Sequence, residues 1–342
     1  MKKTVCFGEI MLRLCPPGYL RFVQADSFEA TYGGGEANVA VSLANFGVPA
    51  SFVSKLPSNE LGQAAVNSLR RYGVCTEDIA RGGDRIGIYF LEKGASQRPS
   101  KVLYDRKNSS LSAARPEDFD WDKIFEDADW FHFTGITPAL GPNVAEITLE
   151  ACKAAKSKGM KVSCDLNYRK NLWSTEEAGR VMGGLMEYVD LCIANEEDAE
   201  KVFGISAEGT DIEGGRLSRD GYKTVAAELA RRFNISKVAV TLRGSVSASD
   251  NVWAAMLYDS KSGEYFFSKS YNVHIVDRVG GGDSFGGGLI YAIKSGKSGA
   301  GAIEFAAAAS CLKHSVEGDF NQVSAAEVEA LAGGDGSGRV QR

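Results

Sequence analysis

The chain has 342 residues, 44% hydrophobic and 24% charged, a composition typical of a globular protein with one large domain and a small appendage, or two modest domains. Its net charge of −5, without a dense cluster of lysine or arginine, argues against a nucleic-acid-binding surface. The seven cysteines form no Cys-x-x-Cys pair and the three histidines stand apart, which argues against a zinc site or a disulfide framework and indicates reduced thiols.

Targeting and membrane segments are not expected. The first apolar run follows two lysines but is interrupted by Glu9, too early for a signal peptide. No apolar stretch approaches the length needed to span a bilayer. We therefore expect a cytoplasmic protein that does not associate with membranes, with a glycine-rich, disordered tail over 332–342.

Short β-rich runs alternate with helical patterns along most of the chain. Such alternation predicts an α/β fold, a doubly wound and mostly parallel sheet with helices on both faces. Ligands bind such sheets at the carboxyl ends of the strands. In chain order the expected elements are strand Thr4–Phe7, helix Glu36–Phe46, strand Ala50–Ser54, helix Leu61–Tyr72, strand Trp130–Phe133, helix Val144–Lys158, strand Lys161–Asp165, strand Leu191–Ala194, helix Glu196–Phe203, helix Thr224–Phe233, strand Lys237–Leu242 and helix Ser284–Lys294.

Two stretches, 14–32 and 85–111, contain β-type segments without helices between them. We interpret them as a small β-sheet lid on a main domain formed by 1–13, 33–84 and 112–331. Tyr104 and Arg106 share one face of a predicted strand. This polar face could look into a substrate cleft, or it could be the solvated face of an edge strand.

The segment from Asp277 to Gly288 carries the most functional information. Three successive glycines at 280–282 allow backbone N–H groups to close around an anion. The helix expected to follow offers further N–H donors and a positive dipole end, which favour phosphate. Asp283 at this point could take a proton from an attacking hydroxyl, as a phosphotransferase requires. A glycine turn in which Asp283 only caps the helix is the alternative.

Three other segments stand where ligands would bind. Gly33–Gly35 would allow a polyol to approach the backbone, with Asn38 offering a donor and an acceptor, although a tight turn before a helix would explain the same residues. Thr241–Ser245 ends one strand and could meet phosphates. Asp165–Arg169 ends another, where Arg169 beside an asparagine and a tyrosine is a candidate ligand.

Other nucleotide and hydrolase motifs fail by spacing. A P-loop ending at Gly296-Lys297-Ser298 would need glycine at Tyr291. A dinucleotide fingerprint beginning at Gly33 would need its last glycine at Asn38, so a dehydrogenase is disfavoured. A Gly-x-Ser-x-Gly spacing occurs at Gly282–Gly286, but it falls inside the glycine segment described above and is not interpreted as a nucleophile elbow. A nucleotide-binding protein therefore remains possible only through a different phosphate-binding device.

Assembled in order, these segments resemble the ribokinase-like carbohydrate kinases, the PfkB family, from about residue 4 to 331. The resemblance rests on two signatures, Gly33–Ala40 and Asp277–Gly288. Within the family, the chain is similar to members that act on 2-keto-3-deoxygluconate. That similarity rests on Gly8-Glu9, Tyr104-Asp105-Arg106, Gly135–Leu140, and Asp165–Arg169 followed by Leu172-Trp173.

The resemblance implies a role for each matching position. Asp283 would be the base acting on the terminal hydroxyl, and Gly280, Gly281 and Gly282 would form the anion hole. The implied substrate contacts are Gly34, Gly35, Asn38, Tyr89, Tyr104, Arg106, Arg169 and Asp319. The implied nucleotide contacts are Asn167, Asn195, Thr241, Arg243, Gly244 and Ser247. Asp198 would serve Mg²⁺ through water, and a monovalent cation, K⁺ or Na⁺, could lie near Asp277.

The implied reaction is phosphorylation of 2-keto-3-deoxygluconate at its 6-hydroxyl by MgATP. A fructokinase, a kinase of another sugar or keto-deoxy sugar acid, or a catalytically silent sugar-binding regulator are alternatives. The chain departs from the family pattern at Asp198, where glutamate is usual, and at Gly281, where alanine is common. An insertion over 206–222 has no assigned role. Exposed edges of the lid predict a homo-oligomer joined through it.

Overall fold

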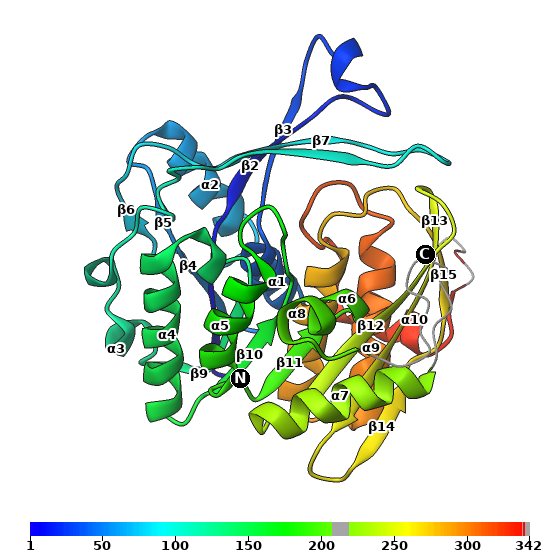
Figure 1. Ribbon diagram of the computed structural model, residues 1–342. Coiled ribbons are helices and arrows are strands. Elements are labelled where there is room, and N and C mark those ends of the chain that lie inside the picture. Colours follow the sequence, from blue (N-terminus) through cyan, green and yellow to red (C-terminus); the bar gives the residue numbers. More distant parts are fainter. Residues whose placement is uncertain (207–218, 337, 339–342) are drawn as a thin grey trace.

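The computed structural model describes residues 1–206, 219–336 and 338. Its centre is a nine-stranded sheet in the order β14-β13-β12-β11-β10-β9-β1-β4, with β15 also pairing with β13 (Figure 1). The strands from β12 to β4 are mutually parallel, whereas β13, β14 and β15 run antiparallel. The bounds are β1 Lys3–Phe7, β4 Ala50–Val53, β9 Ala128–Thr134, β10 Lys161–Asp165, β11 Leu191–Ala194, β12 Lys237–Ser245, β13 Asp250–Asp259, β14 Glu264–Phe267 and β15 Tyr271–His274.

Helices cover both faces of this sheet, as predicted. Alternating strand residues divide between two buried cores, so that Val5 and Phe7 pack on one face and Cys6 on the other. One face is covered by α3 Trp121–Ile124, α4 Pro142–Ser157, α5 Thr175–Met186, α6 Glu196–Phe203 and α7 Arg219–Phe233. The other is covered by α1 Gly35–Asn45, α2 Glu60–Arg70, α8 Gly281–Lys294, α9 Gly299–Lys313 and α10 Ala325–Ala332. The predicted doubly wound α/β fold is confirmed.

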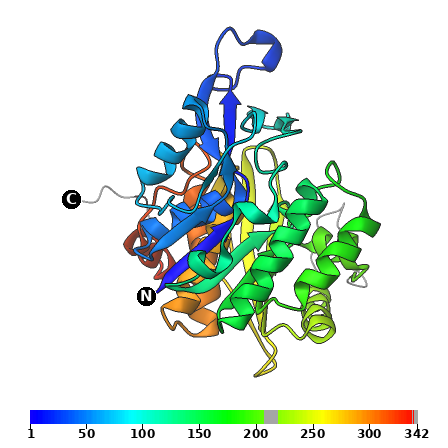
Figure 2. The ribbon, with the colours of Figure 1, turned by 90° about the vertical axis from the view of Figure 1, so that its left-hand side faces the viewer.

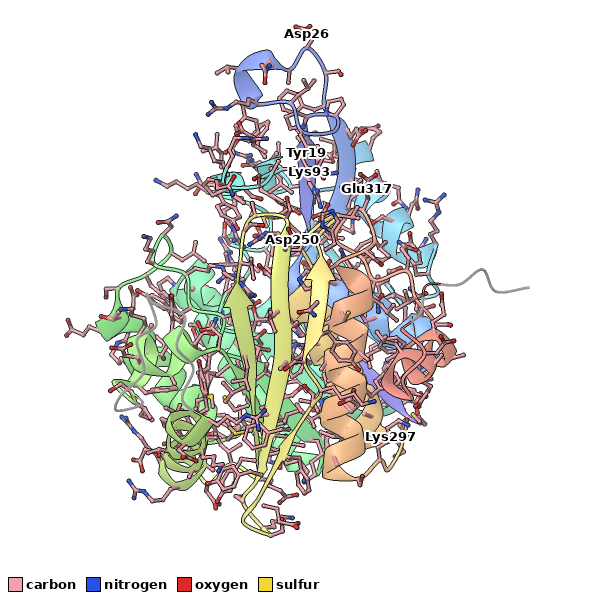
Figure 3. All side chains as sticks on the ribbon, turned by 90° about the vertical axis from the view of Figure 1, so that its right-hand side faces the viewer. Tyr19, Asp26, Lys93, Asp250, Lys297 and Glu317 are labelled. Carbon is pink, nitrogen blue, oxygen red and sulfur yellow. The ribbon has the colours of Figure 1, made fainter. Side chains whose placement is uncertain are left out.

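A separate four-stranded sheet in the order β3-β2-β7-β8 projects from one end of the molecule (Figure 2). It comprises β2 Met11–Cys15, β3 Glu29–Gly33, β7 Ile88–Glu92 and β8 Lys101–Asp105. The sheet therefore starts at Met11, three residues before the lid segment expected from the sequence. Figure 3 shows Asp26 at the tip of the projection and Lys93 beside Glu317 nearer its base, where the two form an ion pair of 2.9 Å. A two-stranded sheet joins β5 Lys55–Leu56 to β6 Ala80–Arg81.

The element predictions differ from the structure mainly at the ends. Helix α7 begins at Arg219, five residues before the predicted start, and so takes up the last part of the predicted insertion. Residues 207–218 of that insertion lie outside the described residues, as do 337 and 339–342 of the predicted tail. Helix α9 was not predicted, because its buried alanines give it apolar character on every side and no helical period.

The structure also bears on the predictions about membrane segments and cysteines. Within the described ranges, no helix is both long and apolar enough to cross a bilayer. All seven cysteines are free thiols. Each cysteine is therefore packed as a separate side chain, and the seven do not form a disulfide framework.

Candidate active site

A cavity of about 360 Å³ opens at the carboxyl ends of the parallel strands, between the main sheet and the small sheet. Its walls include Asp165 at the end of β10, Ala194 at the end of β11 and Thr241 in β12. This is the edge at which ligands bind doubly wound sheets. The predicted site residues that line it are Gly34, Gly35, Asn38, Tyr89, Tyr104, Arg106, Asn167, Arg169, Asn195, Asp198, Thr241, Arg243, Gly280, Gly282, Asp283 and Asp319.

Helix α8 begins at the cavity with the predicted glycine turn. Gly280 is its N-cap residue and has φ +82°, in the left-handed region. A Cβ at Gly280 would come within 2.0 Å of the carbonyl oxygen of Asp319, so only glycine fits. Gly281 does not line the cavity, and its N–H group makes a long bond of 3.4 Å to the carbonyl of Arg278. The anion-binding donors are therefore expected from the first N–H groups of the helix around Gly282.

Asp283 lies in the first turn of α8 and does not cap it. The helix begins at Gly281, two residues before Asp283, and the N-cap position makes no side-chain hydrogen bond. The Asp283 carboxylate instead accepts a 2.6 Å hydrogen bond from the Asn38 amide, a residue of α1. Burial raises the pKa of Asp283 to about 6, while the Asn38 bond acts to lower it. The carboxylate is thus oriented from outside its own helix and is ionised at neutral pH.

Both the oxygen and the nitrogen of the Asn38 side-chain amide form hydrogen bonds. Its oxygen accepts a 3.2 Å bond from the N–H of Gly34, and its nitrogen donates to Asp283. The side chain is 2% exposed. The predicted substrate contact of Asn38 is therefore accompanied by a second role, which is to fix the orientation of Asp283.

Two arginines reach the cavity from opposite sides, as the sequence predicted. Arg106 follows β8 of the small sheet, and its guanidinium forms an ion pair with Glu9 and stands 5.6 Å from the ring of Tyr104. Arg169 follows β10 of the main sheet and donates a 3.1 Å bond to the carbonyl of Tyr168. Tyr104 and Arg106 both face the cavity, so this side of β8 is not simply a solvated edge.

Asp319, a predicted substrate contact, accepts hydrogen bonds from two residues of the small sheet. One carboxylate oxygen accepts a 2.7 Å bond from Arg13, and the other accepts a 2.5 Å bond from the hydroxyl of Tyr89. Arg13, in β2, also pairs with Asp277 at 2.5 Å. All these side chains are buried, so Asp319 and Tyr89 join the small sheet to the main domain at the cavity wall.

Asn195 and Asp198 form the N-terminal cap of α6. The Asn195 side chain accepts from the N–H of Asp198 at 2.9 Å, and the Asp198 carboxylate accepts from the N–H of Asn195 at 3.3 Å and of Tyr168 at 3.0 Å. Burial raises the pKa of Asp198 to about 6. Burial, and then the carboxylates of Asp198 and Asp283, raise the pKa of Asp165. Each carboxylate therefore raises the cost of ionising the others, and the described residues contain no group of three or more His, Cys, Asp or Glu side chains that could hold a metal.

The predicted nucleotide loop reaches the cavity only in part. Thr241 and Arg243 line it, and the Arg243 guanidinium lies 5.1 Å from the ring of Trp253. Gly244 and Ser247 do not line it. The Ser247 hydroxyl instead accepts the N–H of Asp250 at 3.0 Å within the β12–β13 turn.

Several functional residues were not singled out from the sequence. Glu9 and Asp165 lie inside segments that were quoted as motifs, and Arg278 follows Asp277 in the C-terminal signature. Their position in these segments was the only available indication. Arg13 had none, because a single arginine in an apolar strand gives no sign of partners hundreds of residues away.

Comparison with known proteins agrees with this geometry. The family model described as pfkB family carbohydrate kinase matches residues 1–325. The 2-dehydro-3-deoxygalactonokinase of Haloferax volcanii is 35% identical over 336 residues, which cover 97% of this chain and 98% of that protein. A crystal structure of 2-dehydro-3-deoxygluconokinase from Thermotoga maritima is 56% identical, with a TM-score of 0.94 over 98% of this chain and 100% of that chain. A putative ribokinase II from E. coli in complex with ATP and Mg²⁺, 20% identical with a TM-score of 0.80 over 97% of this chain and 99% of that chain, shares the fold.

Proposed function

The chain belongs to the pfkB family of carbohydrate kinases, and we propose that it phosphorylates 2-keto-3-deoxygluconate at its 6-hydroxyl with ATP. The observation that carries this proposal is Asp283, held by Asn38 at the start of a glycine-capped helix, in a cavity with two arginines. The carboxylate takes the proton of the 6-hydroxyl as its oxygen attacks the γ-phosphorus. The bond from that phosphorus to the bridging oxygen breaks, and ADP leaves.

The start of α8 supplies the charge that phosphoryl transfer requires. N–H groups at a helix N-terminus, with the helix dipole behind them, stabilise the negative charge that spreads over the transferring group. Magnesium, when bound, neutralises charge on the ATP phosphates. Asp165 and Asp198, which line the cavity, would hold it together with the ATP phosphates and water. Asp198 would act through water, because its oxygens already accept two backbone N–H groups.

The two arginines support a substrate that carries a carboxylate. A guanidinium binds a carboxylate through two parallel hydrogen bonds, which a neutral sugar cannot reproduce. Arg169 donates only to a backbone carbonyl in the contacts described above, whereas Arg106 is already paired with Glu9. We therefore assign the substrate carboxylate to Arg169 and the neighbouring hydroxyls to the Arg106–Glu9 pair.

A coupled assay of ADP release over a panel of sugars and sugar acids tests this proposal. We expect kcat/KM for 2-keto-3-deoxygluconate to exceed that for fructose and ribose by at least about 10²-fold, the discrimination expected when buried polar groups are left unpaired. Comparable values for fructose would overturn the assignment. The Haloferax volcanii relative favours the galactonate epimer as a second candidate substrate, so both epimers belong in the panel.

We also propose a cytoplasmic homo-oligomer joined through the small sheet. The free thiols of all seven cysteines support a cytoplasmic location for the protein. The outer strand β8 is exposed along its length, and its residues Val102 and Leu103 are 39% and 57% exposed. A second copy that covers this edge would remove its unpaired backbone groups and bury these side chains. Sedimentation at micromolar concentration should show a dimer or larger species, and a monomer would contradict the proposal.

A further inference from the structure

The C-terminal end of α9 forms the floor under the glycine turn of α8. Ser310 donates a 2.7 Å hydrogen bond from its hydroxyl to the carbonyl oxygen of Gly281. The imidazole of His314 lies against the same glycine, where an added Cβ would come within 2.5 Å of the ring. The carbonyl of His314 accepts the N–H of Asp277 at 3.2 Å. The shape of the phosphate-binding turn therefore depends on α9.

Lys313 places a positive charge in this floor. Its side chain is fully buried, and its Cε lies 3.2 Å from the point where a Cβ of Gly280 would stand. The ammonium donates a 3.0 Å bond to the carbonyl of Val316. Burial lowers the pKa of Lys313, and the carboxylates of Asp277 and Asp319 act in the opposite direction. Such a group stays charged inside a protein only where nearby negative charge compensates it.

Four buried charges balance one another behind the turn. Arg13 pairs with Asp277 at 2.5 Å and with Asp319 at 2.7 Å, and the three side chains are between 1% and 3% exposed. Lys313, whose Cε lies against Gly280 of the same turn, adds a second positive charge that the carboxylates of Asp277 and Asp319 favour and burial opposes. Asp277 also accepts the N–H groups of Val279 and Gly318, at 3.1 and 3.2 Å.

The residues around Asp277 therefore do not fit the monovalent cation that the family resemblance suggested. Both oxygens of that carboxylate already have donors, and one of them is an arginine. A K⁺ or Na⁺ ion would add an uncompensated fifth charge to a buried and neutral cluster, which is unfavourable.

We propose that Lys313 takes the place of a monovalent cation in this enzyme. Its ammonium supplies a fixed positive charge behind the N-terminus of α8, where negative charge develops on the transferring phosphoryl group. Lys313 does not touch the reacting atoms, so it is a positioning residue. Catalysis then needs no added K⁺ or Na⁺. Only the kinetic part of this inference rests on the proposed phosphoryl transfer.

The first experiment uses the unmodified enzyme. Turnover is measured in KCl, NaCl and choline chloride at equal ionic strength, which keeps electrostatic screening constant. The three values should agree within about twofold, because the fixed charge is already present. Strong activation by K⁺ over choline would overturn the proposal.

The second experiment removes the charge with Lys313→Met. We expect kcat to fall by about 10-fold, less than for loss of a donor that contacts the transition state, because Lys313 acts from behind the turn, and we expect K⁺ or NH₄⁺ to restore part of it. Lys313→Arg keeps the charge, so its kcat should be the same in KCl, NaCl and choline chloride. The matched control is Lys294→Met at the other end of α8, a buried lysine paired with Asp129, which should show no salt-specific change. Normal turnover of Lys313→Met would contradict the role.

A third measurement needs no substrate. The urea midpoint of Lys313→Met should rise in KCl relative to choline chloride, because K⁺ would bind the folded state at the vacated position. The midpoint of the unmodified protein should be the same in both salts. This result holds whatever sugar acid the enzyme accepts, so a wrong substrate assignment leaves it intact. Equal midpoints for the variant in both salts would count against the inference.

Discussion

Two glycine turns start helices at the same cavity, but they serve it in different ways. At the start of α1, a Cβ on Gly34 would come within 1.9 Å of the Glu9 carbonyl, and the Gly34 N–H is already bonded to Asn38. Those glycines allow close packing and hold a positioning side chain. At the start of α8, Gly280 has φ +82°, and Gly280 and Gly282 line the cavity. Similar glycine-rich sequences thus give one turn that holds a side chain of the site and one whose own backbone reaches the cavity.

The largest expected effect comes from Asp283→Asn in the α8 turn. The change removes the proton acceptor but keeps the size of the side chain, so kcat should fall by at least about 10²-fold, as for loss of a general base. Affinity for ATP should stay the same or rise slightly, because a negative charge near the phosphates is gone. Single-turnover kinetics and nucleotide titration measure the two quantities.

Folding of that variant is expected to survive, although not because Asn would replace an N-cap. Asp283 caps nothing, and the half-buried carboxylate has one hydrogen-bond donor in the described contacts, Asn38. An unchanged thermal midpoint together with near-normal turnover would show that Asp283 is not the catalytic base.

Gly280→Ala should produce the next largest effect. The added Cβ would meet the carbonyl of Asp319 at 2.0 Å in a backbone region that costs roughly 1–2 kcal/mol for L-residues. We expect a lower unfolding free energy and a loss of about 10-fold or more in kcat/KM for ATP, since the N–H donors move. Gly282→Ala is the control for stability, because its Cβ meets nothing within 4 Å. Equal stability of the two variants would contradict the argument.

Asn38→Ala tests the α1 turn. Because the Asn38 bond lowers the pKa of Asp283, its loss should raise that pKa above about 6. The acid limb of the kcat/KM profile should therefore move to higher pH, and kcat should fall by about 10-fold as the base loses its orientation. Asn45→Ala on the same helix, which loses a 2.6 Å bond to the Asn321 carbonyl, should affect stability alone. An unmoved acid limb in Asn38→Ala would show that Asn38 does not act on Asp283.

The smallest expected effect on turnover concerns Glu36, also in the α1 turn, where the change is in stability. Its carboxylate accepts from the N–H and hydroxyl of Thr134 and from the hydroxyl of Thr137, and burial raises its pKa to about 7. A raised folded pKa stabilises the protein fully below pH 4.5 and loses that contribution as pH rises through about 7. Glu36→Gln should therefore flatten the pH dependence of the unfolding free energy in this window, by up to about 3 kcal/mol. Parallel curves for both proteins, from urea unfolding at several pH values, would contradict this.

The fold and most of the site could be predicted from local patterns. Strand ends, such as Asp165 and Thr241, follow from period and turn residues, and a parallel sheet brings all of them to one edge. The two glycine signatures correctly predicted that Asn38 and Asp283 line the cavity, although no pattern indicated the hydrogen bond between them.

Contacts made by single residues across long separations could not be predicted. The hydrogen bond from Tyr89 to Asp319, 230 residues apart, depends on packing that no short motif encodes. Gly244 and Ser247 were assigned to the nucleotide site by their position in a motif; Gly244 lies in β12 and Ser247 in the turn after it, and neither lines the cavity. The predicted start of helix α8, Ser284, lies three residues after the observed start at Gly281. Glycine has a low intrinsic helix propensity, so the sequence pattern alone does not extend the helix through the glycines.

The pairing of Arg13 has a consequence for the order in which the molecule can be built. Its partners stand 264 and 306 positions later in the chain, so the first strands of the small sheet emerge during synthesis long before the carboxylates that neutralise them. Contacts of such separation form late in folding. Until residue 277 has been added, this arginine has no counter-charge to be buried with, and until residue 319 has been added, the wall of the cavity cannot close. Competence for catalysis is thereby linked to completion of nearly the whole polypeptide.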